Sequence, residues 1–424
     1  MQVENPKYFD FKYQSRTLAL NEVENQLAAN EAVIEYFDAD SALFVFTISR
    51  AGTSFQSVPV ESDLGDMIER LKVLTSKDHE HTPDFNDLSF EVFSKTIGGP
   101  LSTLDGNIEY LMIVLDGQLF DLNFDILLDG PADLTGWKNL PYLFKKYAIS
   151  YAYSGTTLFQ DYQTSAAAPQ NNLLAFSFGN DDPLTGNKIS MSQLRSNTAE
   201  LPGSSAEIKA LSDLIDGDYF YGNEAHEKRF KEVAADYRIL HLAIHGETNS
   251  QEPENSKLYF FNKGDSLEDG KLHAFELYNM RLKADLAVLS ACNTGSGKID
   301  DGEGIMTLGR AFAYAGVNSI LLSRQQIADA VTPEIMQVFY QGLKSGKRKS
   351  EALREARITF LKTANNISNH PFYWSSFYIL GDDAPVQLST GRSNGYYWWV
   401  GGFLLFIIVL SLLFNRRSKV TEST

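Results

Sequence analysis

The chain of 424 residues is poor in thiols and in positive charge. It has a single cysteine, Cys292, so no disulfide can form within the chain, and a lone thiol does not identify the redox compartment. Most free cysteines are small buried hydrophobes, so packing is the first interpretation of Cys292. The net charge is −17 and no concentrated basic stripe is present. Because such a chain repels phosphate backbones, the composition argues against nucleic-acid binding.

The N-terminus lacks the basic residues and the apolar run of a signal peptide. The C-terminal end is different, because Tyr396 to Phe414 contains 19 residues and no charge. A helix of that length crosses the hydrocarbon core of a bilayer, which is about 30 Å thick. Aromatic residues at its start and the basic tail of residues 415–424 match the two interfaces. We therefore expect a transmembrane helix over residues 396–414, with a buried core helix as the alternative.

Two arguments about the membrane side of the folded part disagree. Arg416, Arg417 and Lys419 follow the predicted helix, whereas only Arg392 lies close before it, and this bias places the tail in the cytoplasm and the rest outside. A tail-anchored chain without a signal peptide instead keeps its folded part in the cytoplasm. We take the cytoplasmic location of the folded part as the prediction.

A small polar stretch, residues 163–172, separates two halves with different patterns. Before it we expect helices over 13–29 and 62–74, and strands over 33–37, 43–48, 55–60 and 111–115. After it, helical stretches alternate with apolar runs at 173–176, 239–244, 286–289 and 320–322. That alternation is typical of βαβ units. We therefore expect an α/β fold with a parallel sheet flanked by helices.

Three helices of the second half carry signals at their ends. Ile305, Leu308 and Phe312 are spaced to share one face of a helix that Gly316 ends. The next two helices are expected to begin at N-cap residues Thr332 and Ser350, and the first of these caps is followed by a proline.

Two of the predicted strands end in residues that can carry out chemistry. Ile239–Ile244 leads directly into His245 and Gly246, and Leu286–Leu289 leads into Ser290, Ala291 and Cys292. In open α/β sheets, ligands bind outside the carboxyl ends of the strands. If the two strands are neighbours, both reactive side chains face one crevice. The alternative is a core histidine and a core cysteine.

A thiol beside an imidazole can act as a nucleophile. The imidazole takes the thiol proton, and the resulting thiolate attacks a carbonyl carbon. The backbone N–H groups of Gly246 and Cys292 are candidate donors to the oxyanion that forms. Glycines between positions 295 and 304 allow the following loop to close over a peptide. We therefore predict a cysteine nucleophile, Cys292, with His245 as its base and with no cofactor.

Other candidate sites are set aside. Residues 78–81 hold two acidic residues and two histidines in a polar stretch, without a third ligand at a suitable spacing. The glycines of 295–304 lack the Lys-Ser/Thr of a phosphate-binding loop, and residues 154–155 lack the surroundings of a nucleophile elbow. His241 lies on the same strand face as His245 and is expected to be a packed residue. No metal site is predicted.

These residues resemble the CHAT-domain family of caspase-like (clan CD) cysteine peptidases. Ile239–Gly246, ILHLAIHG, is similar to the His-Gly motif of the family, and Leu286–Gly295, LAVLSACNTG, is similar to its Ser-Ala-Cys-x-Thr-Gly motif. The 47 positions between His245 and Cys292 are also close to the spacing in caspases. Further matches are Leu201–Gly203, Glu207, Gly222, Ala225, Gly302–Gly304, Arg310–Gly316 and His370–Trp374. The resemblance covers roughly residues 30 to 385.

The resemblance implies a caspase-haemoglobinase-like fold. It implies a helical stub in residues 1–30, a degenerate α/β half in residues 31–165 and the catalytic half in residues 170–385. Family members commonly carry tetratricopeptide repeats ahead of the peptidase, so the stub is read as the end of such an array. A tetratricopeptide-repeat or other regulatory protein is an expected partner. The expected substrate is a protein whose peptide bonds are hydrolysed.

One stretch departs from the family pattern. The family usually shows Ser-Leu-Trp-x-Val-x-Asp, whereas Ser323–Asp329 reads SRQQIAD here. By analogy with the family, Ser290, Asp329 and Arg324 line the pocket for the P1 side chain, which precedes the cleaved bond. Asp329 favours a basic P1 residue and Arg324 opposes it. The departure also keeps a rival function open, a catalytically silent scaffold that binds protein partners at a membrane.

Overall fold

The structure is a computed structural model that describes most of the chain. The described residues are 17–39, 41–60, 63–76, 83–132, 136–159, 168–179, 202–249, 251–262, 268–290, 298–300, 304–306, 308–325 and 331–389. The chain divides into two units, Met1–Leu388 and Ser389–Thr424. Within the second unit the structure describes Ser389 alone. The predicted membrane helix, 396–414, and the tail, 415–424, lie outside the described residues. No helix within the described ranges is both long and apolar enough to span a bilayer.

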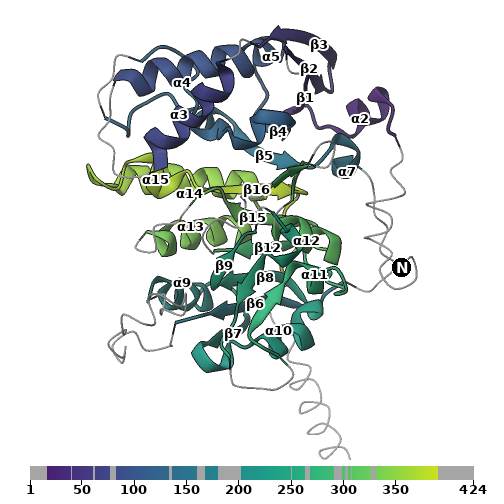
Figure 1. Cartoon of the computed structure of the whole chain (residues 1–424), viewed down its shortest axis with the longest axis vertical. Helices are drawn as coiled ribbons and strands as arrows, with labels where there is room; N and C mark the ends of the chain where they lie inside the picture. The colour runs from purple at the N-terminus through teal and green to yellow at the C-terminus, as the bar shows by residue number, and fades with distance from the viewer. Residues whose placement is uncertain are drawn as a thin grey trace, which may run out of the picture. The chain divides into compact units, whose positions relative to one another are not determined.

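One sheet of eleven strands runs through the first unit, in the order β3-β2-β1-β4-β5-β16-β15-β12-β8-β6-β7 (Figure 1). The N-terminal half supplies β1 (Glu31–Asp38), β2 (Ala42–Ser49), β3 (Gly52–Pro59), β4 (Tyr110–Val114) and β5 (Ala148–Ala152). The second half supplies β6 (Asn171–Ser177), β7 (Gly217–Tyr221), β8 (Tyr237–Ala243), β12 (Leu286–Leu289), β15 (Ser319–Ser323) and β16 (Phe377–Gly381).

Parallel pairing dominates this sheet. The neighbours from β15 through β12, β8 and β6 to β7 are parallel, as are β1 with β4, β4 with β5, and β5 with β16. The hairpin strands β1, β2 and β3 pair antiparallel, and so do β15 and β16. The prediction of an α/β fold with a parallel sheet is therefore confirmed for the second half. The two predicted halves share a single sheet, in which β5 meets β16 where Tyr151 pairs with Leu380.

Helices cover both faces of the sheet. They are α2 (Leu20–Gln26), α3 (Leu64–Ser76), α4 (Pro83–Thr96), α5 (Gly98–Ser102), α6 (Leu143–Lys146), α7 (Gly155–Phe159), α9 (Pro202–Ser212), α10 (Glu227–Val233), α11 (Ala274–Leu277), α12 (Leu308–Ala315), α13 (Thr332–Lys344), α14 (Lys349–Thr363) and α15 (Pro371–Trp374). Figure 1 shows α9 and α13 on one side of the second-half strands and α10, α11 and α12 on the other. Because both faces are covered, β12 is buried along its whole length, which explains its uninterrupted apolar run.

Three expectations for helix ends in the second half need correction. Ile305 lies in the strand β14 (Gly304–Met306), opposite Ile299, and not on the helix that begins at Leu308. The N-cap of α13 is Val331, one residue before the expected Thr332. The N-cap of α14 is Arg348, and Ser350 is already helical.

The carboxylate of Asp383, after β16, explains the start of α14. It accepts hydrogen bonds from the backbone N–H and the hydroxyl of Ser350, at 2.6 Å each. Asp383, which is distant in sequence, therefore accepts the hydrogen bond from a backbone N–H group in the first turn of α14. In many helices the side chain of the N-cap residue accepts this bond. The short helix α2 lies inside the predicted helix 13–29, of which residues 13–16 are outside the described residues.

Candidate active site

The two strands that carry the reactive motifs are neighbours. Strand β12 pairs parallel with β8, and Leu289 lies opposite Leu242. The ladder continues one step further, because the backbone N–H of Ser290 donates to the carbonyl of Leu242 at 3.1 Å. The two strands are therefore neighbours, which is the pairing that the predicted crevice requires. The carboxyl ends of both strands lie side by side, as the topology of parallel sheets requires for a ligand site.

His245 lies at the point where the chain leaves the large sheet. It begins β9 (His245–Glu247), which pairs antiparallel with β10 (Lys257–Tyr259) and sets His245 opposite Tyr259. The His245 ring is half-buried, and the ring of Phe178 meets it edge to face with 5.0 Å between the centroids. Phe178 follows β6, so an aromatic side chain from the neighbouring strand end packs against the imidazole.

Cys292 and Asp329 lie outside the described residues. The register of the described strands bears on Cys292, because each residue of β12 pairs with the residue 47 positions earlier in β8. His245 and Cys292 are separated by the same 47 positions. The two motifs thus follow the paired strands at equal distances along the chain.

Ser290 is bonded to a carboxylate that is shielded from solvent. Its hydroxyl donates to Oε2 of Glu207 at 2.9 Å. Glu207 belongs to α9 and its side chain is 3% exposed. The other carboxylate oxygen, Oε1, lies 3.0 Å from Nε2 of His241, which is fully buried in β8. The expectation that His241 is a packed residue is confirmed, and Glu207 lies beside it without the alignment of a hydrogen bond.

The imidazole of His241 continues the chain of contacts to helix α13. Nδ1 of His241 lies 2.8 Å from the hydroxyl of Tyr340. Burial, and secondarily the charge of Glu207, raise the pKa of Tyr340 well above its usual value, so the phenol keeps its proton and can donate to Nδ1. Nε2 then carries the histidine proton and faces Glu207. The opposite tautomer would set two lone pairs against each other at 3.0 Å.

Arg324 is held at the junction with the N-terminal half. Its guanidinium stacks between Tyr151 and Tyr378, with 4.7 and 4.3 Å to the ring centroids. Nη1 donates to the carbonyl of Phe120 at 3.0 Å. Of the three residues predicted to line the P1 pocket, the structure therefore sets Ser290 at the end of β12 and engages Arg324 with residues on β5 and β16.

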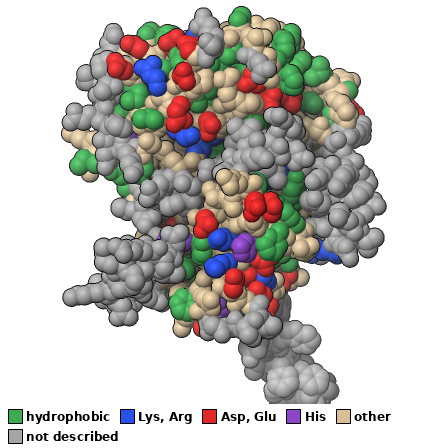
Figure 2. All heavy atoms as spheres, viewed as in Figure 1, with side chains coloured by type: hydrophobic (Ala, Val, Ile, Leu, Met, Phe, Trp, Pro, Cys, Tyr) green, Lys and Arg blue, Asp and Glu red, His purple; other side chains and the backbone are tan. Residues whose placement is uncertain are grey.

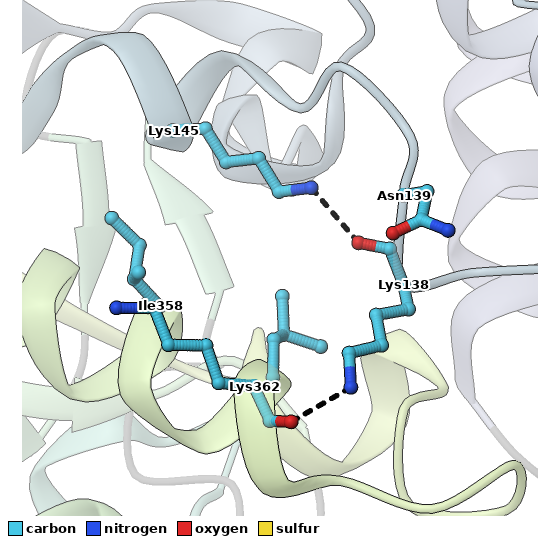
Figure 3. Close-up of a pocket in the computed structure, with 6 residues that line it drawn as sticks. Lys138, Asn139, Lys145, Ile358 and Lys362 are labelled. Atoms are coloured by element: carbon cyan, nitrogen blue, oxygen red, sulfur yellow. Dashed lines mark hydrogen bonds between the residues drawn. The ribbon is translucent and has the colours of Figure 1, made fainter.

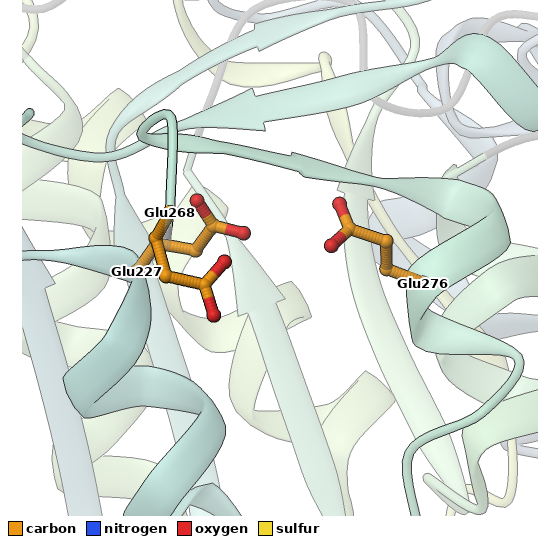
Figure 4. Close-up of side chains that lie close together, drawn as sticks. All are labelled: Glu227, Glu268 and Glu276. Carbon is orange, nitrogen blue, oxygen red and sulfur yellow. The ribbon is translucent and has the colours of Figure 1, made fainter. Parts of the chain in front are cut away.

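A group of three glutamates has the composition of a cation site. Glu227 at the start of α10, Glu268 and Glu276 of α11 converge in Figure 4. The Nζ atom of Lys231 lies 2.6 Å from Glu227 and 2.7 Å from each of the other two. Burial raises the pKa of Glu227, and the ammonium group partly offsets this effect. The lysine already supplies the positive charge at this position, so the cluster is an ion-pair network and we assign no metal to it.

A cavity of about 310 Å³ lies between the segment around α6 and helix α14 (Figure 3). It is lined by Lys138, Asn139, Lys145, Ile358, Leu361 and Lys362. The amine of Lys145 donates to the carbonyls of Lys138 and Leu140, at 2.9 and 2.8 Å, and the amine of Lys138 donates to the carbonyl of Lys362 at 2.8 Å. These bonds join chain segments to one another, and no predicted site residue lines the cavity.

The surface drawn in Figure 2 carries charges of both signs in small groups. Acidic side chains are spread over the described part of this face, and basic ones lie among them. No continuous basic stripe is visible on the described residues of this face, which agrees with the charge distribution in the sequence.

Sequence reasoning named Glu207 as a motif residue but did not connect it to Ser290 or His241. The three side chains come from different elements, so no local pattern relates them. The one available signal was the burial expected for His241, since a buried imidazole needs hydrogen-bonding partners.

The comparisons with known proteins agree with these motifs. The family model described as CHAT domain matches residues 90–382, which is more than half of the chain. Human tetratricopeptide repeat protein 28 is 24% identical over 321 residues, which are 68% of this chain and 12% of that protein. The mouse protein of the same name is 30% identical over 122 residues, which are 29% of this chain and 5% of that protein. The chain therefore spans only a small part of these curated relatives.

Two solved structures are also similar. The Saccharomyces cerevisiae separase–securin complex matches with a TM-score of 0.47 and 10% identity, over 85% of this chain and 30% of that chain. The Arg-specific cysteine proteinase gingipain R matches with a TM-score of 0.41 and 11% identity, over 76% of both chains.

Proposed function

Because the chain belongs to the CHAT domain family, we propose that it is a cysteine peptidase with Cys292 as nucleophile and His245 as base. The observation that carries this proposal is the parallel pairing of β8 with β12. It brings the ends of the two motif-bearing strands together in a register of 47 positions, the separation of His245 and Cys292. The family motifs around both residues support the same assignment.

The proposed reaction is hydrolysis of a peptide bond by acyl transfer to sulfur. His245 takes the thiol proton, and the thiolate attacks the carbonyl carbon to form a C–S bond. The backbone N–H groups of Gly246 and Cys292 would donate to the oxyanion. The imidazolium then gives its proton to the leaving amine as the C–N bond breaks. Water, deprotonated by the imidazole, hydrolyses the thioester and restores the thiol, so no cofactor is needed.

For specificity we keep a basic P1 residue as the proposal. Asp329 is the carboxylate that would favour it, and Ser290 adds a neutral hydroxyl. Arg324 is the residue that would oppose a basic side chain, but its guanidinium is stacked between Tyr151 and Tyr378. That engagement reduces its influence on a pocket. A peptide library read by mass spectrometry would contradict this proposal if cleavage followed Asp or Glu.

The rival function is a silent scaffold that binds protein partners. Two observations favour it: the departure of SRQQIAD from the family pattern, and a relative named for tetratricopeptide repeats. A tetratricopeptide-repeat or other regulatory protein remains the proposed partner under either function. Reactivity of Cys292 separates the two, because a scaffold requires no activated thiol.

The test uses the single thiol of the chain. A peptide carrying a thiol-directed electrophile is incubated with the full-length protein, and any adduct must be at Cys292 because no other cysteine exists. We expect rapid labelling of the wild-type protein and slow labelling of His245→Ala. Equal rates in the two proteins would remove the peptidase proposal and leave the scaffold.

We also propose that residues 396–414 tether the protein to a membrane, with the peptidase on the cytoplasmic side. Deleting residues 396–424 should release a soluble protein that keeps the described fold, and its presence in the membrane pellet would contradict the tether. Ser423→Cys reports the orientation in a Cys292→Ala background. Labelling by an impermeant reagent in intact cells supports a cytoplasmic peptidase, whereas protection until lysis reverses it.

A further inference from the structure

A buried carboxylate holds the end of the strand that leads to the proposed nucleophile. We propose that Glu207 is a positioning residue that fixes Ser290, and through it the backbone that continues to Cys292. This inference rests on the proposed function and adds to it a residue on helix α9. Glu207 does not belong to the dyad and does not touch the substrate in this proposal.

The geometry of Glu207 leaves neither carboxylate oxygen without a contact. Oε2 accepts the hydroxyl proton of Ser290 at 2.9 Å, and Oε1 faces Nε2 of His241 at 3.0 Å. Tyr340 completes the row with 2.8 Å to Nδ1 of His241. The hydrogen bonds in this row are those of Ser290 with Glu207 and of His241 with Tyr340, while Oε1 and Nε2 lie close together without hydrogen-bond alignment. Side chains of α9 and α13 thus meet those of β8 and the residue after β12.

Helix α9 is itself anchored at the end of a neighbouring strand. The hydroxyls of Ser204 and Ser205 lie 2.8 and 3.2 Å from the hydroxyl of Ser177, the last residue of β6. The backbone N–H of Gly179 donates to Ser177 and Ser204. The first turns of α9 thus contact the ends of β6 and β12, so Glu207 extends from a support that is already fixed at this edge of the sheet.

A carboxylate suits this position better than an amide. Both neighbours of Glu207, the hydroxyl of Ser290 and Nε2–H of His241, are donors, and a glutamine side chain has a single oxygen acceptor. The NH₂ group of a glutamine would face one of the two donors in a buried space. A buried donor without an acceptor is costly, so the Ser290 hydroxyl would rotate away or the strand end would shift.

Covalent geometry carries such a shift to the next residues. Two peptide units join the α-carbons of Ser290 and Cys292, which are therefore at most about 7 Å apart. A displacement of the strand end by a fraction of an ångström changes how the thiol meets the imidazole. Misplacements of about 1 Å caused by substitutions away from the chemistry can lower rates by about 100-fold.

The experiment measures alkylation of Cys292 by iodoacetamide across pH in the full-length protein. This small reagent needs no P1 pocket, so the rate reports the thiolate and not substrate binding. We expect Glu207→Gln to lower the rate at neutral pH about tenfold and to shift its pH profile toward that of His245→Ala.

Matched variants separate positioning from general loss of packing. Glu227→Gln removes a carboxylate that is equally buried but lies in the network around Lys231, and it should leave the alkylation profile of the wild-type protein unchanged. Ser290→Ala removes the bond while Glu207 keeps its contact with His241. It should reproduce the shift, and adding Glu207→Gln to it should change the profile little further. Ser290→Thr keeps the hydroxyl and should restore the profile.

The outcomes distinguish this inference from the proposed function. If the wild-type protein and His245→Ala alkylate equally, the dyad is absent and the proposed function fails. If those two differ but both Glu207→Gln and Ser290→Ala match the wild-type profile, the dyad stands and the positioning role of Glu207 is wrong. Circular dichroism checks folding, and if Glu207→Gln does not fold, the Ser290→Ala profile decides alone.

Discussion

Two buried carboxylates, one in each half of the chain, have different neighbours. Asp125, in the N-terminal half, lies 2.6 Å from Nη1 of Arg357 on α14, and both side chains are buried. Glu207, in the second half, contacts the hydroxyl of Ser290 and the imidazole of His241. The first carboxylate therefore has a permanent cation beside it, and the second has a hydroxyl donor and an adjacent imidazole.

The Asp125–Arg357 pair belongs to the junction between the two halves. Arg357 also donates to the carbonyls of Trp374 and Phe377, and Asn123 donates to the carbonyl of Ser375. Charge and hydrogen bonds are satisfied together, which is the condition under which a buried ion pair is tolerated. Burial raises the pKa of Asp125, and the charge of Arg357 opposes that effect.

The difference indicates what each network does. A carboxylate paired with a guanidinium from a distant helix joins two parts of the chain. A carboxylate bonded to the Ser290 hydroxyl and adjacent to an imidazole lies at the end of the strand that precedes Cys292. The comparison therefore predicts that substitutions at the junction lower stability and that substitutions near the strand ends lower activity.

The largest expected effect is that of Cys292→Ala on hydrolysis. Removing the nucleophile should lower kcat at least about 1000-fold, which corresponds to about 4 kcal/mol in the activation free energy. The change deletes one sulfur atom, so thermal unfolding should remain close to that of the wild-type protein. Full activity of Cys292→Ala in a peptide assay would contradict the proposed nucleophile. If Cys292→Ala did not fold, substitutions near the strand ends would lower stability as well, and the predicted difference from the junction would be wrong.

The next effect concerns stability at the junction. Arg357→Met leaves Asp125 buried without its cation, and breaking a buried pair in this way costs about 3–5 kcal/mol in the free energy of unfolding. Urea unfolding measures this loss. Adding Asp125→Asn should recover part of the stability, because the stranded charge is removed.

An exposed pair provides the control for that loss. Lys72 lies 3.4 Å from Glu69 on the surface of α3, and Lys72→Met should change the free energy of unfolding by less than about 1 kcal/mol. If Arg357→Met and Lys72→Met lowered the free energy of unfolding equally, the buried pair of Asp125 and Arg357 would not stabilise the junction more than an exposed pair does.

The sequence predicted those strands whose whole pattern is local. β12 was expected with its observed bounds because four apolar residues in a row, followed by Ser290, mark a strand covered on both faces. β5 and β16 were not predicted. Tyr151 and Tyr378 lie within them and are buried by aromatic packing and by Arg324, which is distant from both in sequence. The same limit explains the N-cap of α14, which depends on Asp383.

In the candidate site, too, features with a local sequence pattern were predicted and contacts between distant residues were not. The motifs around His245 and Cys292 are continuous in sequence. Whether their strands are neighbours was left open by the sequence and is shown by the structure. The contacts of Glu207 with Ser290 and His241 join residues that are 83 and 34 positions apart. Tyr340 is 99 positions from His241. Hydrophobic periodicity carries no information about such pairs, because the partners meet only after the helices have packed on the sheet.

The smallest expected effect is on the pH dependence of stability, through Tyr110 at the contact between β4 and α14 and away from the candidate site. The hydroxyl of Tyr110 on β4 donates to Glu351 of α14 at 3.1 Å, and burial together with the charge of Glu351 raises the pKa of Tyr110 to about 12. Between pH 10 and 12 the unfolded chain loses this proton while the folded protein keeps it. The folded state therefore binds more protons, so stability falls as pH rises through this window. Tyr110→Phe should flatten that decline, as measured by urea unfolding at several alkaline pH values, and should leave the alkylation profile of Cys292 unchanged. Glu351→Gln should lower the titration midpoint of Tyr110 in the ultraviolet difference spectrum against Tyr110→Phe. A midpoint near 10 in the wild-type protein would show that the contact between β4 and α14 does not shield this phenol.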